Sequence, residues 1–286
     1  MQILPRTRLL ALALLATGAA QAVAGDAPNA TALDRVNLRM IGLTADQRLI
    51  SFREQDPANA SSVGYVTGLG GGDTALVGID YRVQDGKLYG VGNAGGVYLI
   101  NAGTAGATLV NRLSVALSGT NFGVDFNPAA DRLRIVSDTG QNLRHNVNAG
   151  GVTLVDTAAN YVVGTPASGV TGSAYTNNDL QAATATTLFD LDIALDQVAI
   201  QAPPNNGSLS ATGKTSVNAV GDSGFDIYSA PGNGTTFSNS GYAVLTTADG
   251  VSALYNVNLL TGKASTIADF EETAPVVDLA IPLAQR

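Results

Sequence analysis

The densest group of chemically versatile side chains lies in residues 122–146, FGVDFNPAADRLRIVSDTGQNLRHN. It contains the only histidine of the chain, His145, and histidine is suited to general base catalysis or metal binding. With one histidine and no cysteine, however, the chain cannot form a histidine-cluster or thiolate zinc site. The segment is therefore either an active site or a charged part of the scaffold. Its other charged residues are Asp125, Asp131, Arg132, Arg134, Asp138 and Arg144.

A second set of candidates is an aspartate that recurs in one short motif. GIDY, GVDF, GFDI and VVDL carry Asp80, Asp125, Asp226 and Asp278 at the same position. A fifth copy, GSAY, has Ala174 there instead. Carboxylates at equivalent positions can serve either a common structural purpose or a shared ion.

A third group of carboxylates lies in residues 189–196, FDLDIALD. Glycoside hydrolysis needs two carboxylates at a defined separation, so this run deserves consideration as a site. Strict alternation would place Asp190, Asp192 and Asp196 on one face of a strand. We expect that face to point to solvent as a ladder of carboxylates. No G-x-S-x-G nucleophile motif is present, and the glycine-rich residues 68–78 lack the P-loop lysine, which indicates a linker.

The elements that position these residues follow from an internal repeat. Residues 78–110 align with residues 123–155 without a gap at an offset of 45. Looser copies begin near residues 172, 224 and 276, which gives a period of roughly 45 to 52 residues. Each unit contains four short strand-like runs separated by Gly, Asn and Asp turns, a pattern typical of a β-propeller blade.

The sequence therefore predicts an all-β fold, a β-propeller of five blades with four antiparallel strands each. The run at 276–283 lacks partners of its own, whereas residues 37–69 contain three strand-like runs before the first full unit. Pairing of these N- and C-terminal strands would complete the fifth blade and remove exposed sheet edges. Six blades are the alternative, if residues 156–222 contain a further small one.

In a propeller, the first strand of each blade lines the central channel. The repeated aspartates could then converge on a hard cation such as Ca²⁺, which prefers oxygen ligands. Alternatively, each could accept backbone N–H groups of a loop or of the next blade as a repeated clip. Repetition favours the clip, so no residue is assigned as catalytic or as a metal ligand, and Ca²⁺ remains a possible cofactor. The candidate ligand-binding, channel-lining residues are Asp80, Asp125, Asp226, Asp278 and Arg134.

The repeat also changes the interpretation of the charged segment, residues 122–146. His145 aligns with Ile100, so we expect it to replace an aliphatic residue between packed blades or at their rim. Arg132 aligns with Lys87, which indicates a solvated strand end.

Two further positions of this segment differ in what they imply. Asp131 aligns with Gly86, and both are turn-forming types. Arg134 replaces Tyr89 and is not explained by the repeat. We expect it to pair with Asp138 or with a carboxylate of a neighbouring blade.

The N-terminus carries the features of an export signal. Arg6 and Arg8 precede a short apolar run and an A-x-A site at 22–24, which predicts a secretory signal peptide over 1–24. A flexible segment, 25–36, and a single propeller domain, 37–286, would follow. Location in the periplasm or outside the cell is then expected. The net charge of −8 argues against nucleic acid as a partner, and no apolar run is long enough for membrane insertion.

At residues 78–92, 122–146 and 203–209 the sequence resembles a bacterial family known as domain of unknown function 4394. The resemblance covers roughly residues 37–282 and implies an extracytoplasmic, propeller-like protein, but neither an activity nor a catalytic residue. The leading hypothesis is a monomeric binding module for a protein or glycan partner. The alternatives are a cation-dependent carbohydrate-active hydrolase or lyase that uses the channel aspartates, and a structural surface or matrix component.

Overall fold

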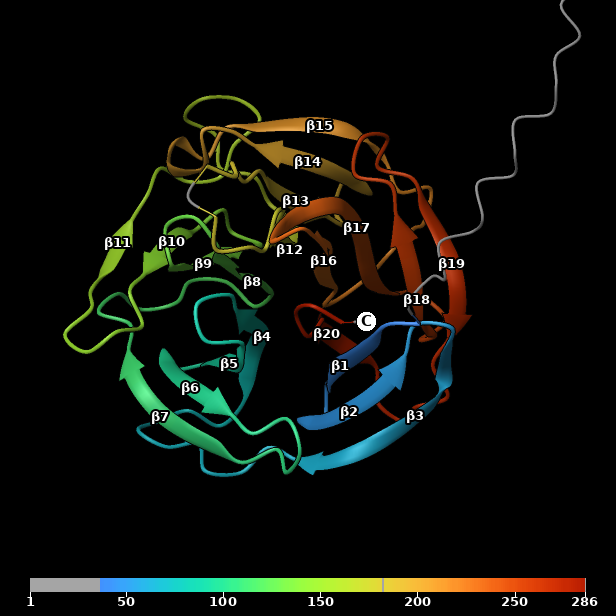
Figure 1. Ribbon diagram of the computed structural model, residues 1–286. Helices are drawn as coiled ribbons and strands as arrows, with labels where there is room; N and C mark the ends of the chain where they lie inside the picture. Colours follow the sequence, from blue (N-terminus) through green and yellow to red (C-terminus); the bar gives the residue numbers. More distant parts are fainter. Residues whose placement is uncertain (1–36, 182, 286) are drawn as a thin grey trace, which may run out of the picture. The chain divides into compact units, whose positions relative to one another are not determined.

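The computed structural model describes residues 37–181 and 183–285, and the predicted signal peptide and flexible segment lie outside them. Twenty strands form five separate four-stranded antiparallel sheets, arranged as blades around a common centre (Figure 1). This confirms the five-bladed β-propeller. Over the described residues there is no α-helix, and hence none that could cross a membrane.

Blade 1 joins the two ends of the described chain. Ile41, Gly42 and Leu43 of β1 pair antiparallel with β20, so the predicted closure is confirmed (Figure 1, β1 in blue beside β20 in red). The backbone N–H of Ala45 also donates to the carbonyl of Pro275 at 2.8 Å. The blade consists of β20 (Val276–Ala280), β1 (Arg39–Thr44), β2 (Arg48–Arg53) and β3 (Asp56–Tyr65).

The other four blades are each contiguous in the sequence. Blade 2 contains β4 (Leu76–Arg82), β5 (Lys87–Gly92), β6 (Gly96–Ile100) and β7 (Ala107–Arg112). Blade 3 contains β8 (Phe122–Asn127), β9 (Arg132–Ser137), β10 (Asn142–His145) and β11 (Thr153–Val155). Blade 4 contains β12 (Val170–Tyr175), β13 (Leu188–Asp192), β14 (Gln197–Gln201) and β15 (Leu209–Lys214). Blade 5 contains β16 (Gly224–Gly232), β17 (Thr235–Thr246), β18 (Ser252–Val257) and β19 (Ala264–Asp269).

The turns form where the sequence supplies residues that tolerate a left-handed backbone. Gly86 and Asp131 end equivalent loops of blades 2 and 3 with φ of 66° and 50°. Aspartate is one of the few residues with a side chain that visits this region readily. The predicted equivalence of these two turn positions is therefore confirmed.

The core is divided among the blade interfaces rather than collected in one place. Each pair of neighbouring blades encloses its own cluster of buried apolar side chains. Among the described residues, the cluster between blades 3 and 4 has six buried members, whereas the other four have ten to thirteen. Among the described residues, the interface between blades 3 and 4 therefore has the smallest apolar cluster.

Candidate functional site

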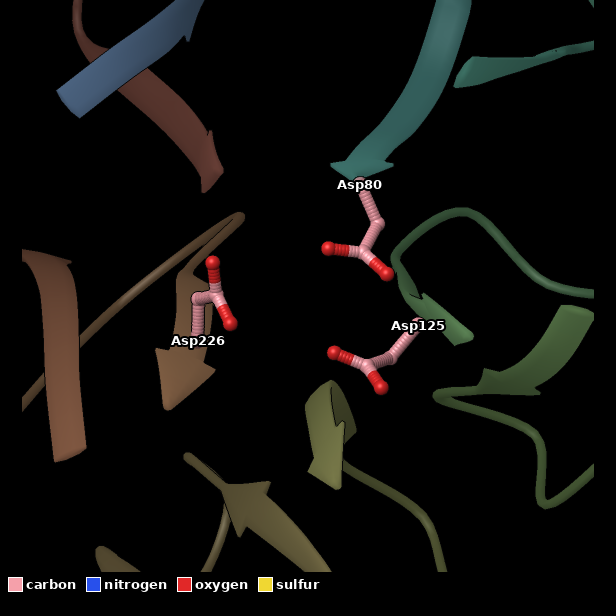
Figure 2. Close-up of side chains that lie close together, drawn as sticks. All are labelled: Asp80, Asp125 and Asp226. Carbon is pink, nitrogen blue, oxygen red and sulfur yellow. The ribbon is translucent and has the colours of Figure 1, made fainter. Parts of the chain in front are cut away.

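Three of the four repeated aspartates converge at the centre of the propeller. Asp80, Asp125 and Asp226 project from β4, β8 and β16 toward one another (Figure 2), and one carboxylate oxygen of each lies within 4.8 Å of the others. All three are buried, with 2 to 6 % of their surface exposed. Asp278, on β20, is also buried but lies outside this group of three.

Each repeated aspartate links its blade to the next one around the ring. Its carboxylate accepts a backbone N–H from the inner strand of the following blade or, for Asp226, from the residue just after that strand. This confirms the structural clip. The four bonds are Asp278 Oδ2 to Ile79 N at 2.7 Å, Asp80 Oδ2 to Phe126 N at 2.7 Å, Asp125 Oδ1 to Tyr175 N at 3.1 Å and Asp226 Oδ2 to Ile281 N at 2.6 Å.

Burial gives these carboxyl groups an unusual affinity for protons. Desolvation, and after it the charges of the other aspartates, raise the pKa of Asp80 and Asp125 well above the ordinary value. Burial likewise raises the pKa of Asp226 to about 6. The hydrogen bonds that Asp226 accepts from two backbone N–H groups lower this pKa but do not outweigh the burial. Burial and the mutual repulsion of neighbouring carboxylates therefore both favour the protonated form of these groups.

The chemistry of this group suits a hard cation only in part. Carboxylate oxygens are the ligands that Ca²⁺ prefers, but Ca²⁺ takes about six to eight of them. The three side chains meet in the protein interior, and each of the three carboxylates accepts a backbone N–H of its own or the next blade. The clip accounts for the arrangement without an ion, and the cation hypothesis remains a prediction to be tested.

The expected carboxylate ladder of residues 189–196 is wrong. Strand β13 ends at Asp192 and β14 begins at Gln197, so the alternation stops in the turn, where Asp196 has a φ of 47°. Asp190 and Asp192 are buried, with 0 and 1 % of their surface exposed. Asp190 Oδ1 accepts a hydrogen bond of 2.6 Å from Ser173 Oγ, and burial raises the pKa of Asp190 to about 7.

His145 is a packing residue, as its alignment with Ile100 predicts. Its ring is fully buried, between Thr153 Oγ1 at 3.0 Å from Nδ1 and Asn111 Oδ1 at 2.9 Å from Nε2. Desolvation lowers the pKa of His145 to about 4, so the ring is neutral at physiological pH. Its hydrogen bond to Asn111 joins blade 3 to blade 2.

Arg134 does not lie at the centre of the propeller with the aspartates. It projects from β9 into the interface between blades 3 and 4, with 1 % of its surface exposed. Its Nη1 donates to Asp156 Oδ2 at 2.7 Å and to Asn142 Oδ1 at 2.6 Å. Its Nη2 donates to Asn205 Oδ1 at 2.9 Å and its Nε to the Tyr175 hydroxyl at 3.2 Å.

The expected pairing of Arg134 with Asp138 is wrong. Asp138 instead accepts hydrogen bonds from the backbone and the hydroxyl of Thr120 and from the backbone of Asn121. The alternative expectation, a carboxylate of a neighbouring blade, is also wrong. The ion-pair partner of Arg134 is Asp156, which directly follows β11 of the same blade.

Around Arg134 the structure forms a pocket, here called the arginine pocket, with a volume of about 280 Å³. It lies between blades 3 and 4, at the end of the ring where β8 and β12 terminate. Arg132 and Arg144 contribute to it, and the sequence interpretation missed both as site residues. A signal was available for Arg144: the turn at 138–141 places it opposite Arg134 in a hairpin. The lining residues are Asn127, Ala130, Arg132, Arg134, Arg144, Tyr175, Thr186, Pro204 and Asn205.

Comparison with known proteins places the chain in a family. A search of curated proteins found no match. A structural genomics protein of unknown function from Bacteroides thetaiotaomicron shares 14 % identity, with a TM-score of 0.44 over 87 % of this chain and 68 % of that one. Apo AztD from Citrobacter koseri shares 10 % identity, with a TM-score of 0.38 over 83 % of this chain and 74 % of that one. Similarity at this level carries no information on function. A family model described as domain of unknown function (DUF4394) matches residues 48–280, and the chain belongs to this family.

Proposed function

We propose that this protein is an extracytoplasmic binding module that takes the end group of a glycan into the arginine pocket. The observation that carries the proposal is the pocket itself. It is a concave site at a blade interface, and its lining consists mainly of side chains that form hydrogen bonds. The extracytoplasmic location rests on the predicted signal peptide at residues 1–24.

The size of the pocket favours a small polar ligand over a protein surface. Its volume of about 280 Å³ is slightly below the roughly 300–1,000 Å³ typical of sites for drug-sized molecules. A stable protein partner needs a far wider contact, about 800 Å² on each side. A terminal sugar fits these dimensions, and Asn127, Thr186 and Asn205 offer groups that pair with sugar hydroxyls.

The enzyme alternative is less well supported. It depends on the central aspartates, and these are buried and engaged in links between blades. The alternative of a surface or matrix component predicts multimers in gel filtration without any ligand, whereas the binding module predicts a monomer.

A glycan array tests the proposal with a matched pair of variants. Ala130 lines the pocket and Ala129 does not, although both are exposed and adjacent. We expect the wild-type protein and Ala129→Trp to bind the same glycans and Ala130→Trp to lose them, because the indole fills the pocket. Equal binding by both variants would place the glycan site elsewhere, and no binding to any glycan would contradict the proposal.

A further inference from the structure

The arginine pocket contains a pair of charges that no other blade has at the same place. In blade 3, Asp125, Arg134 and Arg144 lie opposite one another across β8, β9 and β10. Residues in such register share one face of the sheet, and two like charges directly opposite each other are destabilising. The corresponding pairs are Leu43 and Leu49 in blade 1, Tyr89 and Leu99 in blade 2, Phe189 and Ile200 in blade 4, and Tyr242 and Asn256 in blade 5.

One carboxylate forms ion pairs with both of these arginines. Asp156 accepts Arg134 Nη1 at 2.7 Å and Arg144 Nε at 2.6 Å on the same oxygen, Oδ2. Its Oδ1 accepts Arg144 Nη2 at 2.8 Å. Within the described part of the chain, Arg144 Nη1 has no hydrogen-bond partner. The pair therefore keeps an excess positive charge and an unused donor at the pocket.

A third arginine adds to this excess. Arg132 lies two residues before Arg134 on β9, so both side chains point to the same side of the blade. Its Nη1 donates only to the backbone carbonyls of Ala130 and Asp131, at 3.2 and 2.7 Å. No carboxylate lies within ion-pair distance of Arg132 over residues 37–181 and 183–285. Among the lining residues there are three arginines and no acidic side chain.

The interface between blades 3 and 4 contains buried charge where the other interfaces contain apolar packing. Its buried apolar cluster is the smallest of the five, and Arg134 occupies a position that is apolar or aromatic in every other blade. Burying a guanidinium costs free energy even when it is paired. The chain as a whole is acidic, with a net charge of −8, so a cationic pocket stands out against its surroundings.

We infer that the ligand of the arginine pocket is an anionic saccharide whose carboxylate or sulfate group binds between Arg132 and Arg144. This inference rests on the proposed function and specifies its ligand. The free guanidinium donors bind the oxyanion, for which the planar arginine fork is well matched. Asn127, Thr186 and Asn205 then bind the hydroxyl groups of the same sugar.

Titration calorimetry with four probes at constant ionic strength tests the inference. The probes are a galacturonic acid disaccharide, its methyl ester, a sulfated galactose disaccharide and the neutral galactose disaccharide. We expect an acidic probe to bind and the ester and the neutral probe not to bind. Preference for the carboxylate or for the sulfate probe identifies which oxyanion the pocket takes.

Three variants locate the contact. Arg132→Gln and Arg144→Gln each remove one charge-assisted hydrogen bond, so the dissociation constant should rise about 10-fold or more. Lys87→Gln is the matched control, because Lys87 is the counterpart of Arg132 in blade 2 and the same charge is lost outside the pocket. We expect it to bind like the wild-type protein. Unchanged melting temperatures show that the losses do not come from misfolding.

The other outcomes separate this inference from the proposed function. If the neutral probe binds as tightly as the acidic ones and Ala130→Trp abolishes this, glycan binding stands and the anionic ligand is wrong. If a polyglutamate peptide binds with the same dependence on Arg132 and Arg144, the saccharide is wrong and an acidic peptide takes its place. If the array and all probes give no binding, both proposals fail.

Discussion

At the scale of single residues, a buried carboxyl group links each of four blades to the next. Asp226 shows why the residue must be an acceptor: its two oxygens receive the backbone N–H groups of Ile281 and Ile227 at 2.6 and 2.5 Å. A buried N–H without an acceptor costs about 1–3 kcal/mol, so the carboxyl group satisfies two donors that would otherwise weaken the ring. Blade 4, with Ala174, lacks this link.

Two substitutions of Asp226 distinguish the effect of its hydrogen bonds from the effect of its charge. Asp226→Ala leaves two buried donors unpaired and should lower the free energy of unfolding by about 2–6 kcal/mol at pH 4. Asp226→Asn keeps an acceptor oxygen and should cost less. Urea unfolding at pH 4, 6 and 8 measures both.

The pH dependence of the same variants has a defined sign. The pKa of Asp226 is about 6 in the folded protein and about 4 in the unfolded chain, so folding binds a proton. Its stabilising contribution is complete below pH 4 and is lost as the pH rises through 6. Relative to the wild type, Asp226→Asn should therefore become more stable between pH 4 and 8. If the free energies of unfolding of Asp226→Asn and the wild type differ by the same amount from pH 4 to pH 8, the pKa of Asp226 is not raised.

The central aspartates also predict how the protein responds to calcium. Burial favours the protonated form of these aspartates, and each of them already accepts a backbone N–H. We therefore expect that adding Ca²⁺ to chelator-treated protein leaves the melting temperature unchanged. A cation that bound the folded state at a hundred times its dissociation constant would stabilise it by about 2.7 kcal/mol. If Ca²⁺ raises the melting temperature of the wild-type protein but not that of Asp125→Asn, a calcium site lies at the centre and this expectation is wrong.

At the scale of the structural elements, the hairpin loop between β8 and β9 binds blade 3 to blade 2. The β8–β9 loop carries Asp131, whose carboxylate accepts Arg82 Nε at 2.7 Å and Nη2 at 2.5 Å from the end of β4 in blade 2. Asp131 thus ends its own turn and binds the preceding blade. The hydrogen bonds from Arg82 lower the pKa of Asp131.

The contribution of this ion pair should be small, because both side chains retain contact with solvent. Asp131→Asn keeps a residue that tolerates positive φ but removes the pair, which should cost about 0.2–1 kcal/mol at pH 7. Because the folded pKa of Asp131 is lowered, the contribution should vanish as the pH falls through that pKa. A double-mutant cycle with Arg82→Gln measures the coupling, and a zero coupling energy at pH 7 would show that the contact adds nothing.

At the scale of the whole propeller, stability depends on ring closure by β20. Besides the strand pairing, the side chain of Gln285 accepts the backbone N–H of Arg39 at 2.7 Å and donates to its carbonyl at 2.8 Å. The described ends of the chain are therefore adjacent. Without β20, β1 would expose an unpaired inner edge, and the link from Asp278 to Ile79 would be lost.

Two rearranged chains test this closure. Deletion of residues 276–286 should abolish cooperative unfolding and cause aggregation in gel filtration. A circular permutant that starts at Thr273, with Gln285 joined to Asn37 by a short flexible linker, keeps every strand and should melt cooperatively as a monomer. Cooperative melting of the deletion variant would show that four blades and three strands suffice.

The five blades, their closure, the turn positions and the equivalence of the four linking aspartates could all be predicted from the order of the amino acids. These follow from strand periodicity, turn chemistry and a repeat, which are properties of each unit alone. His145 could be identified as a packing residue for the same reason: its counterpart, Ile100, is apolar. The alternation could not predict Asp190 as buried, because every residue of β13 is buried and neither face of this strand points to solvent.

The arginine pocket could not be predicted in this way, because its lining comes from two blades. Arg134 and Arg144 belong to blade 3, but Tyr175, Thr186 and Asn205 come from blade 4, more than 30 residues further along the chain. An alignment of repeats compares each residue with its equivalent and not with its neighbour across a blade interface. The excess charge arises within blade 3, where two facing arginines share the carboxylate of Asp156. The pocket that contains this charge depends on the packing of blade 4 against blade 3, which neither blade encodes alone.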